Sequence, residues 1–475
     1  MSSVSDMSSI DQLVAQYRVS KRKPAAVLES KRSALNNRLA VLADLKTKLK
    51  TLKTTSEDMA KTGTTSKFNT FTVSSTNATL ATASSTTSAL IGTHSLKIGR
   101  VAKNDTLVSD RVTAASTSII TAEGAGTKSV RISLNGVDTD VNIELVAGDT
   151  NDTVLDKLVN AINDSDAEVT ASNIGDTGTT NKLVLVSKST GASNAISLTN
   201  IAGTLLDNLG LNSSVVSGRT ASTNTTAGYS NSSVDLLNSS ITVDGITIEK
   251  EVNTITDVLK GVTLQLKGAH APTDDPLTLT VDVNKASIKE KVQKFITDYN
   301  AAITYINTKT QYDSLTNTRE ALSGDTNFTT FRYNLRSIAS STVSSVKTGN
   351  PKLLSDIGIS VGRDGTLSLA HPDTFDDMLD GSVEKIEDLF NSSNGIANKL
   401  VTLIDGMTNT SVGKIVAAKD QADSQVLTLT NRIKRFDETL DRHVIKYRND
   451  FLRLQAAYNK ILNQQQSISA ITQYY

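Results

Sequence analysis

The 475-residue chain has no cysteine, no tryptophan, only five prolines and 4% aromatic residues. Without cysteine it has no disulfide bond, no thiolate metal site and no thiol nucleophile. No apolar run approaches the roughly 18 residues that a membrane-spanning helix requires. Residues 1–16 lack the basic region and apolar stretch of a cleaved signal peptide, so we expect any export to use another route.

Motifs for catalysis and for cofactor binding are also scarce. Four histidines are scattered along the chain, at His94, His270, His371 and His443. No two of them stand at metal-binding spacing on one helix face, and neither a glycine-rich phosphate loop nor a calcium loop is found. The stretch 344–349 contains Ser-x-x-Lys and Lys-Thr-Gly fragments, but one lysine would have to serve both motifs. The sequence therefore predicts no enzyme, no cofactor and no metal site.

Positive charge gathers at the two ends of the chain. Residues 1–53 carry eleven Lys/Arg against four Asp/Glu, and residues 426–475 carry eight against four, although the total formal charge is zero. Such ends can indicate nucleic-acid or membrane binding. The basic run at 18–23 has no interleaved aromatic residues and belongs to no recognisable nucleic-acid-binding module. We interpret both ends as solvated or partner-facing helix surfaces, and the acidic stretch 373–388 as a solvated helix face.

Both ends also carry heptad repeats of apolar residues. The repeat is Leu28, Leu35, Leu42 and Leu49 in the N-terminal arm, and Val426, Ile433, Leu440, Tyr447, Leu454, Ile461 and Ile468 in the C-terminal arm. Heptads sustained over this length favour a coiled coil. His443, Asp450 and Gln464 interrupt the second apolar position of the C-terminal arm, which favours pairing that depends on a partner. The heptad residues are the predicted partner-binding seam.

Each arm spans about 50 residues, or on the order of 75 Å if fully helical. Pro24 stands where a helix could begin, because its missing N–H group costs nothing in the first turn. Long arms bury little surface by themselves, so we expect them to pair with each other or with another chain. An ordinary helical hairpin that closes one domain is the alternative.

Between residues 67 and 282 the pattern changes to short β-branched runs separated by turn signals. Asn135-Gly136 and Asp244-Gly245 each separate two such runs, which strongly indicates two-residue hairpins. A helix is predicted at 153–163, among strands at 130–134, 141–145, 168–173 and 182–187. Residues 212–233 are rich in Ser, Thr and Asn and are interpreted as a loop or linker.

From Ile288 onward a helical period returns. The predicted buried face consists of Ile288, Val292, Phe295, Ile296, Tyr299, Ile303 and Ile306. Further helices are predicted at 331–339, 383–389 and 396–404, with a small hairpin at 361–367. The chain thus runs out along helices, through a β block and back along helices. The predicted fold class is α+β and multidomain.

Short motifs follow one another in a fixed order along the chain. They are Ile10-Asp11-Gln12-Leu13, Lys23-Pro24, 257–264, 277–281, Phe295-Ile296-Thr297-Asp298-Tyr299-Asn300, Leu322-Ser323-Gly324-Asp325, Ile357-Gly358-Ile359, 364–369 and Gly395-Ile396-Ala397. In order and spacing they resemble the flagellar filament-capping protein family, also called hook-associated protein 2. Residues 130–198 are similar to the hook–flagellin insertion repeat of flagellar axial proteins.

The resemblance implies paired N- and C-terminal coiled-coil helices, a helical leg domain, and β-rich outer domains inserted between them. The terminal coiled coil would comprise 1–45 with 426–475, and the leg 46–75 with 284–425. A β-rich cap plate would comprise 76–118 with 230–283. The outer β domain, with the insertion-type unit, would comprise 119–229.

The resemblance also implies a function. It is that of a non-enzymatic assembly factor for motility, which caps the filament of the bacterial flagellum, promotes flagellin folding and polymerisation, and prevents flagellin leakage. The implied partners are further copies of the chain, commonly a pentamer, together with flagellin, the hook–filament junction proteins and a cytoplasmic export chaperone that holds the C-terminal helix. The implied location is extracellular, at the flagellum tip. No nucleic acid and no membrane insertion are expected.

Two other hypotheses about the function stay open. Flagellin and the hook–filament junction proteins share terminal coiled coils, but their usual Ser-Gly-x-x-Ile-Asn start and Asp-Asp-Ala-Ala-Gly string are not found here. A surface adhesin could use the β block to bind host glycans.

Overall fold

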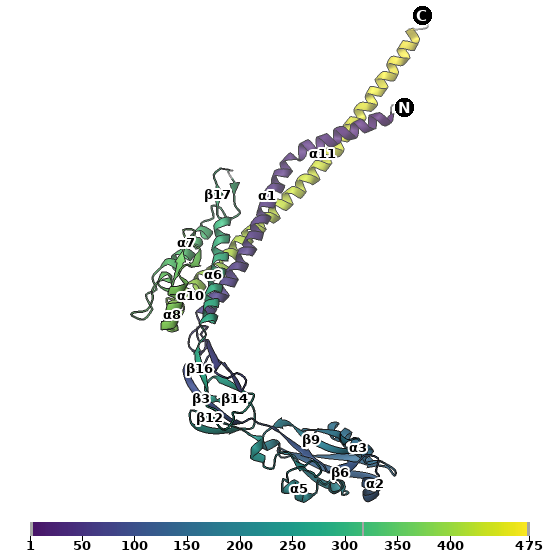
Figure 1. Ribbon diagram of the computed structural model, residues 1–475. Coiled ribbons are helices and arrows are strands. Elements are labelled where there is room, and N and C mark those ends of the chain that lie inside the picture. The colour runs from purple at the N-terminus through teal and green to yellow at the C-terminus, as the bar shows by residue number, and fades with distance from the viewer. Residues whose placement is uncertain (1–2, 316–317, 473–475) are drawn as a thin grey trace. The chain divides into compact units, whose positions relative to one another are not determined.

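The computed structural model describes residues 3–315 and 318–472 (Figure 1). The chain divides into two compact units, each described here by itself. The helical unit holds the chain up to Phe68 and again from Lys285 onward. The β unit holds the intervening residues, from Asn69 to Asn284.

Helices dominate the helical unit. They are α1 (Ser3–Met59), α6 (Lys285–Lys309), α7 (Thr326–Ser340), α8 (Pro372–Gly381), α9 (Val383–Asn391), α10 (Ile396–Thr408) and α11 (Lys414–Thr472). Two short hairpins accompany them, β17 (Tyr312–Asp313) with β18 (Thr318–Arg319) and β19 (Ile359–Val361) with β20 (Leu367–Leu369). Single 3-10 turns are η1 (Gly63–Thr65) and η4 (Leu354–Ile357). The helices predicted at 331–339, 383–389 and 396–404 are thus confirmed as α7, α9 and α10.

The two terminal arms form single long helices. α1 has 57 residues and α11 has 59, and the two lie side by side (Figure 1). Arg18 of α1 bonds to Asp441 of α11, and Arg22, one turn later, bonds to Asp437, one turn earlier. The helices are therefore antiparallel, and the predicted pairing of the terminal helices is confirmed.

The predicted helix start at Pro24 is wrong. α1 begins at Ser3 and continues through Pro24. A proline inside a helix removes one backbone hydrogen bond and crowds the preceding turn. Contacts on both sides of it hold this helix, because Ala25 is fully buried and Arg22 bonds to Asp437 of α11. Tertiary contacts of this kind outweigh the local signal of a proline.

The core of the helical unit lies around α6. Its predicted face is confirmed, since the buried residues of α6 include Ile288, Val292, Phe295, Ile296, Tyr299, Ile303 and Ile306. α6 packs against α1 and α7, and α10 packs against the same two helices. The Phe295 ring meets the Phe390 ring of α9 edge-on, with centroids 5.4 Å apart, a favourable aromatic geometry. This core anchors the base of both long helices.

The β unit is built of short strands with a few helices between them. The strands are β1 (Phe71–Ser75), β2 (Ala81–Ser85), β3 (Gly92–Arg100), β4 (Asn104–Val108), β5 (Val112–Thr113), β6 (Gly126–Leu134), β7 (Val137–Leu145), β8 (Val169–Thr177), β9 (Thr180–Thr190), β10 (Ser197–Ala202), β11 (Gly228–Tyr229), β12 (Ser239–Val243), β13 (Ile246–Lys250), β14 (Thr254–Leu259), β15 (Val262–Leu266) and β16 (Leu277–Val283). The helical segments are α2 (Ser118–Glu123), α3 (Asn151–Asn163), α4 (Leu205–Asn208), α5 (Ser213–Ser217), η2 (Ala192–Asn194) and η3 (Val234–Leu237).

These strands form two sheet pairs, each with its own core. In the first pair, the sheet β1-β16-β3-β12-β13 and the sheet β14-β15-β2 bury a shared cluster that includes Leu96, Leu264 and Leu279. In the second, the sheet β10-β6-β7 and the sheet β11-β4-β9-β5, with β8 beside β9, enclose a cluster that includes Leu107 and Leu158. The named strands pair antiparallel throughout, as in β6 with β7 and β12 with β13.

Both predicted two-residue hairpin turns are confirmed. Asn135 and Gly136 have φ of 48° and 75° between β6 and β7, and Asp244 and Gly245 have 50° and 87° between β12 and β13. Two successive positive φ values are the mark of a type I′ turn, whose twist matches that of the flanking strands. The predicted helix at 153–163 is confirmed as α3, whose N-terminus is capped by the Thr150 side chain.

The interpretation of residues 212–233 as a loop or linker is wrong. The segment contains α5 and β11, and Tyr229 lies fully buried in the core of the second sheet pair. Arg219 reaches Asp105, which has no exposed surface, with its Nη2 2.5 Å from Oδ1. The same guanidinium lies 4.1 Å from the centre of the Tyr229 ring. The Arg219–Asp105 ion pair and the buried Tyr229 ring therefore hold this segment in the core, although it contains no run of apolar residues.

The boundary between the units falls slightly earlier than the sequence places it. β1 begins at Phe71 and pairs with β16, so residues 71–75 belong to the β unit, whereas the sequence puts 46–75 with the leg domain. The finer division, into terminal coiled coil, leg, cap plate and outer β domain, stays a prediction.

Candidate partner-binding seam of the terminal helices

The first part of the predicted seam lies in the core of the helical unit. Leu42 and Leu49 of α1 are buried, together with Leu45 and Leu52 on the same side of the helix. Here α1 packs against α6 and α10 as well as α11. This part of the heptad stabilises the unit itself, because its leucines are already covered within one chain.

The middle part of the seam lies in the contact between α1 and α11. Ile433 and Leu440 of α11 are buried, whereas Leu28, Leu35 and Val426 are half-buried. The reason is geometric: two helices by themselves cannot surround a side chain as fully as a bundle does.

Aromatic stacking supports the pairing farther along the arms. The ring of Tyr447, a predicted seam residue, stacks on that of Tyr17 with centroids 4.1 Å apart. Phe451 meets Tyr447 edge-on at 4.9 Å. Such pairs contribute about 0.5–1.5 kcal/mol beyond the area they bury. The heptad does not predict Tyr17 as a seam residue, because a lone tyrosine outside the leucine repeat gives no periodic signal.

The last part of the seam is exposed. Leu454, Ile461 and Ile468 show 66%, 54% and 62% of their surface to solvent. α11 continues past the N-terminal end of α1 (Figure 1). Tyr458, between the first two, is also exposed, so Leu454, Tyr458 and Ile461 form an apolar stripe at helical spacing. We call these three residues the exposed stripe.

Three ion pairs agree with a single register of the two arms. Arg18 lies 2.8 Å from Asp441, Arg22 lies 3.0 Å from Asp437, and Arg448 lies 3.0 Å from Asp11. Seven residues separate Asp11 from Arg18 on α1, and seven separate Asp441 from Arg448 on α11. One alignment therefore satisfies all three pairs, without a bulge in either helix.

The ion pairs also shift the ionisation of their members. The hydrogen bond from Arg22 holds the pKa of the Asp437 carboxyl below its usual range. Asp437 and Glu29 together raise the pKa of Arg22 above its ordinary value. The sequence contains a signal for this, since Arg18 and Arg22 stand one turn apart, as do Asp437 and Asp441. From the sequence alone the basic run at 18–23 indicates a solvated or partner-facing surface, because nothing local identifies the carboxylates that it meets.

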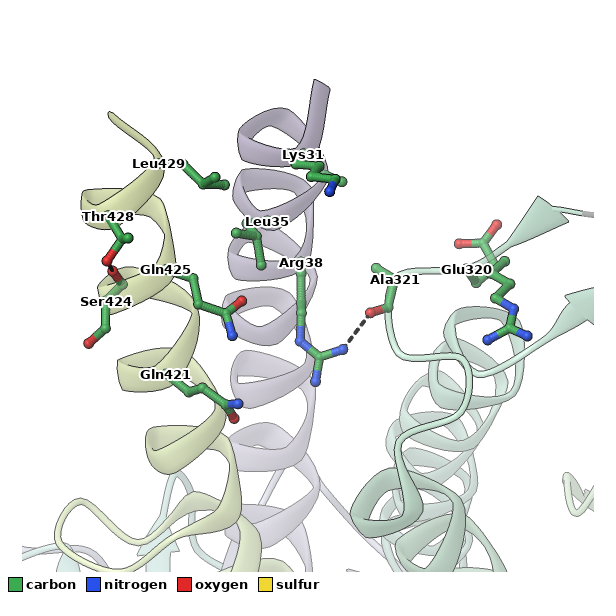
Figure 2. A pocket seen from close by; sticks show the side chains of 12 residues that line it. Lys31, Leu35, Arg38, Glu320, Ala321, Gln421, Ser424, Gln425, Thr428 and Leu429 are labelled. Atoms are coloured by element: carbon green, nitrogen blue, oxygen red, sulfur yellow. Dashed lines mark hydrogen bonds between the residues drawn. The ribbon is translucent and has the colours of Figure 1, made fainter. Parts of the chain in front are cut away.

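A groove of about 910 Å³ opens between the two arms (Figure 2). Its lining includes Lys31, Ala34, Leu35, Arg38, Arg319, Glu320, Ala321, Gln421, Ser424, Gln425, Thr428 and Leu429. Arg38 donates to the Ala321 carbonyl at 2.8 Å and to the Asp325 carboxylate at 2.6 Å, which ties α1 to the start of α7. The α11 wall consists mostly of amides and hydroxyls, so the groove offers hydrogen-bonding groups and no nucleophile with a base.

In the stretch 344–349, the one lysine shared by the Ser-x-x-Lys and Lys-Thr-Gly fragments is already paired with a carboxylate. Lys347 forms an ion pair with Glu384 at the surface, and Ser345 donates to the Ser392 hydroxyl. His94 bonds to Asp244, and His270 accepts a hydrogen bond from the Ile98 amide. Within residues 3–315 and 318–472 no cluster of three or more His, Cys, Asp or Glu is arranged to hold a metal ion. Among the helices described there, none is long and apolar enough to cross a membrane.

Two family models match the chain. The N-terminus of flagellar hook-associated protein 2 matches residues 7–105, and the C-terminus of flagellar hook-associated protein 2 matches residues 237–463. Together they cover well over half of the sequence. The chain belongs to the flagellar hook-associated protein 2 family. The family resemblance read from the short motifs is confirmed.

Relatives in this family are moderately similar to the chain. The B-type flagellar hook-associated protein 2 of Pseudomonas aeruginosa is 25% identical over 413 residues, which span 84% of this chain and 82% of that protein. The flagellar hook-associated protein 2 of Salmonella typhimurium is 26% identical over 346 residues, or 71% of this chain and 69% of that protein.

A solved structure shares the fold. The D1-D2-D3 domains of the flagellar cap protein FliD from Escherichia coli align with a TM-score of 0.59 at 23% identity. The match covers 81% of this chain and 99% of that one. The predicted fold class, terminal helices with β-rich domains inserted between them, is confirmed.

Proposed function

We propose that this member of the flagellar hook-associated protein 2 family caps the filament of the bacterial flagellum. In this role it is a non-enzymatic assembly factor, which promotes the folding and polymerisation of flagellin at the tip and prevents its leakage. The work is mechanical: the long helical arms contact the filament end, and the β unit covers the growing tip.

The exposed stripe on α11 carries the proposal. Leu454, Tyr458 and Ile461 place large apolar side chains in solvent, on a helix whose earlier heptads are covered by α1. Full burial of a side chain of this size is worth about 1.5–3 kcal/mol, so a helical partner gains considerably by covering the stripe. A helix laid along such a stripe is a common mode of recognition.

Two kinds of partner suit this stripe at different stages. In the cytoplasm a flagellar export chaperone would hold the C-terminal helix and shield its apolar side. After export the terminal helices of flagellin, and of the hook–filament junction proteins, would take that place. Self-association into a ring would place several arms around the filament end. The family resemblance implies that such a ring commonly has five copies.

The proposed location is extracellular, at the tip of the flagellum, reached through the flagellar secretion channel. The four-part division into terminal coiled coil, leg, cap plate and outer β domain belongs to the same proposal. In it the arms and leg contact the filament, while the two sheet pairs of the β unit supply the plate and the outer domain.

The test is a strain that lacks the gene. We expect hooks without filaments by electron microscopy and monomeric flagellin in the medium, with both defects cured by re-expression of the chain. Normal filaments in the deletion strain would contradict the proposal.

A variant of the stripe sharpens the test. Re-expression of Leu454→Ser/Ile461→Ser should not restore filaments, although the protein is made and folded. Exposed Thr430→Ser and Thr439→Ser on the same helix are the matched controls, and they should restore filaments fully. Full rescue by the stripe variant would show that the stripe is not the contact that the proposal requires.

A further inference from the structure

A second charged feature of the helical unit lies away from the arms. A pocket of about 470 Å³ opens between α6, α7 and the turn of the β19–β20 hairpin. Three arginines line it: Arg332 and Arg336, one turn apart on α7, and Arg363, in the hairpin turn. We call this the arginine pocket. Arginine presents a planar fork of donors that suits carboxylates, so the pocket is shaped for an anionic group.

The positive charge of the arginine pocket is left without ion-pair partners among the residues that the structure describes. None of its three arginines forms a salt bridge to any residue in the described part of the chain. Arg332 donates to the Thr310 hydroxyl at 3.2 Å, and its guanidinium lies 5.3 Å from the centre of the Tyr333 ring. In the arms, by contrast, Arg18, Arg22 and Arg38 each hold a carboxylate.

One carboxylate, that of Asp364, also lines the pocket, but it already accepts hydrogen bonds within the hairpin turn. Asp364 accepts from the Thr366 amide at 3.1 Å and from the Thr366 hydroxyl at 2.7 Å. These bonds are the main cause that lowers the pKa of Asp364, with Arg336 a minor one. With three guanidinium groups and a single carboxylate already bonded, the pocket keeps a positive excess.

A matching negative pair stands elsewhere on the same unit. Asp373 and Asp377 lie one turn apart on α8, are exposed, and form no salt bridge in the described part of the chain. Their helix neighbours Asp376 and Asp380 bond to Lys289 and to Lys285. Asp376 and Asp380 therefore form ion pairs within the chain, whereas Asp373 and Asp377 are exposed and form no ion pair among the described residues.

The two pairs match in spacing as well as in charge. Residues four apart on a helix have Cβ atoms about 5–6 Å apart, both on α7 and on α8. Arginine–carboxylate contacts are among the strongest hydrogen-bonded pairs and fix orientation. The arginine pocket includes the turn at one end of the β19–β20 hairpin, and α8 follows the other end. The aspartates of one chain do not reach its own pocket, so a second copy is the occupant that fits.

We propose that the arginine pocket of one copy binds Asp373 and Asp377 on α8 of a neighbouring copy. This rests on the self-association within the proposed function and gives it an interface. The two patches differ, so the contact is head-to-tail, and contacts of that kind close into rings when the rotation allows. The salt bridges between copies would weaken as ionic strength rises.

The test is self-association of the purified full chain by sedimentation velocity over a range of concentrations. Arg332→Glu/Arg336→Glu should weaken association at least about tenfold, because like charges then face each other. Asp373→Lys/Asp377→Lys should do the same from the other side. The variant with all four changes should recover association, since each interface then has opposite charges again.

Controls separate a lost contact from a damaged fold. Asp373→Asn/Asp377→Asn removes the charge without placing a cation in the first turn of α8, and should also weaken association. Lys352→Glu/Lys414→Glu makes the same charge change as the α7 variant at two exposed lysines of the helical unit, and should leave association unchanged. Helix content by circular dichroism should be equal in all variants.

The outcomes are distinct. Recovery in the fourfold variant establishes the contact. Wild-type association that is insensitive to both charge reversals overturns it, while the proposed cap function, tested separately on the deletion strain, is untouched. A loss with the arginine variant alone also overturns it, because it shows an anionic occupant other than α8. A wild-type chain that stays monomeric at every concentration overturns it as well.

Discussion

Leu440 and Leu454 allow a direct test of where the seam is closed within one chain. They occupy the same heptad position of α11, two heptads apart, yet Leu440 is 4% exposed and Leu454 is 66% exposed. From the sequence alone the two are equivalent. In the structure the first packs in the α1–α11 contact and the second lies on the exposed stripe.

The magnitudes follow from burial. Truncating a buried leucine to alanine costs about 2–5 kcal/mol, the spread reflecting how well the site collapses. Two helices can close around a small gap, so we expect Leu440→Ala to lower the local stability of the arms by about 2–3 kcal/mol. A substitution at an exposed position changes stability by less than about 0.5 kcal/mol. Leu454→Ala should therefore leave the arms of the isolated chain unchanged.

Hydrogen exchange resolved along the two helices measures this. With Leu440→Ala, amides of α11 between residues 430 and 447, and those facing them on α1, should exchange on the order of 30-fold or more faster, the equivalent of 2 kcal/mol or above. With Leu454→Ala the same amides should keep their wild-type rates. Equal effects of the two variants, or no effect of Leu440→Ala, would refute the assignment of the closed and exposed parts of the seam.

Three further predictions concern charged and polar groups. Arg22→Gln should return the pKa of Asp437 to the usual range, which the NMR shift of the Asp437 carboxyl carbon measures. In the wild type, the stabilisation by the Arg22–Asp437 pair is complete above about pH 3.9, the pKa of an unfolded aspartate. It is lost as the pH falls through the lower pKa that Asp437 has in the folded state. Arg219→Met leaves Asp105 buried without its cation and should destabilise the second sheet pair by about 3–5 kcal/mol, measured by exchange of the β4 amides; unchanged exchange would contradict the role of this pair. Burial raises the pKa of Tyr229 to about 12. The stabilisation by its neutral form is therefore complete below about pH 10 and is lost as the pH rises through about 12. Tyr229→Phe should remove one tyrosine ionisation at high pH from the ultraviolet titration of the protein.

Features with a strong local period could be predicted from the sequence. The apolar face of α6, the two type I′ turns and the long terminal helices depend on spacing along the chain, which the sequence displays directly. Their positions in the structure agree with that spacing because each is decided within a few residues. The overall order of helix, β block and helix follows from these elements.

Features that depend on contacts between distant residues could not be predicted. Arg219 and Asp105 are more than a hundred residues apart, and nothing local announces that they meet in a core. Pro24 gives a correct signal for a helix start in isolation, and tertiary contacts overrule it. The heptad of α11 shows where apolar residues fall, but which of them α1 covers depends on the relative lengths and register of the two helices.

The location of the protein on the flagellum tests the central proposal most directly. Immunogold labelling of intact flagella, with antibodies raised against the β unit, shows by electron microscopy where the chain lies. The cap proposal predicts gold at the distal ends of filaments, and none on hooks or shafts. Gold along the shaft would show a flagellin, gold at the hook–filament boundary would show a junction protein, and either result would contradict the account.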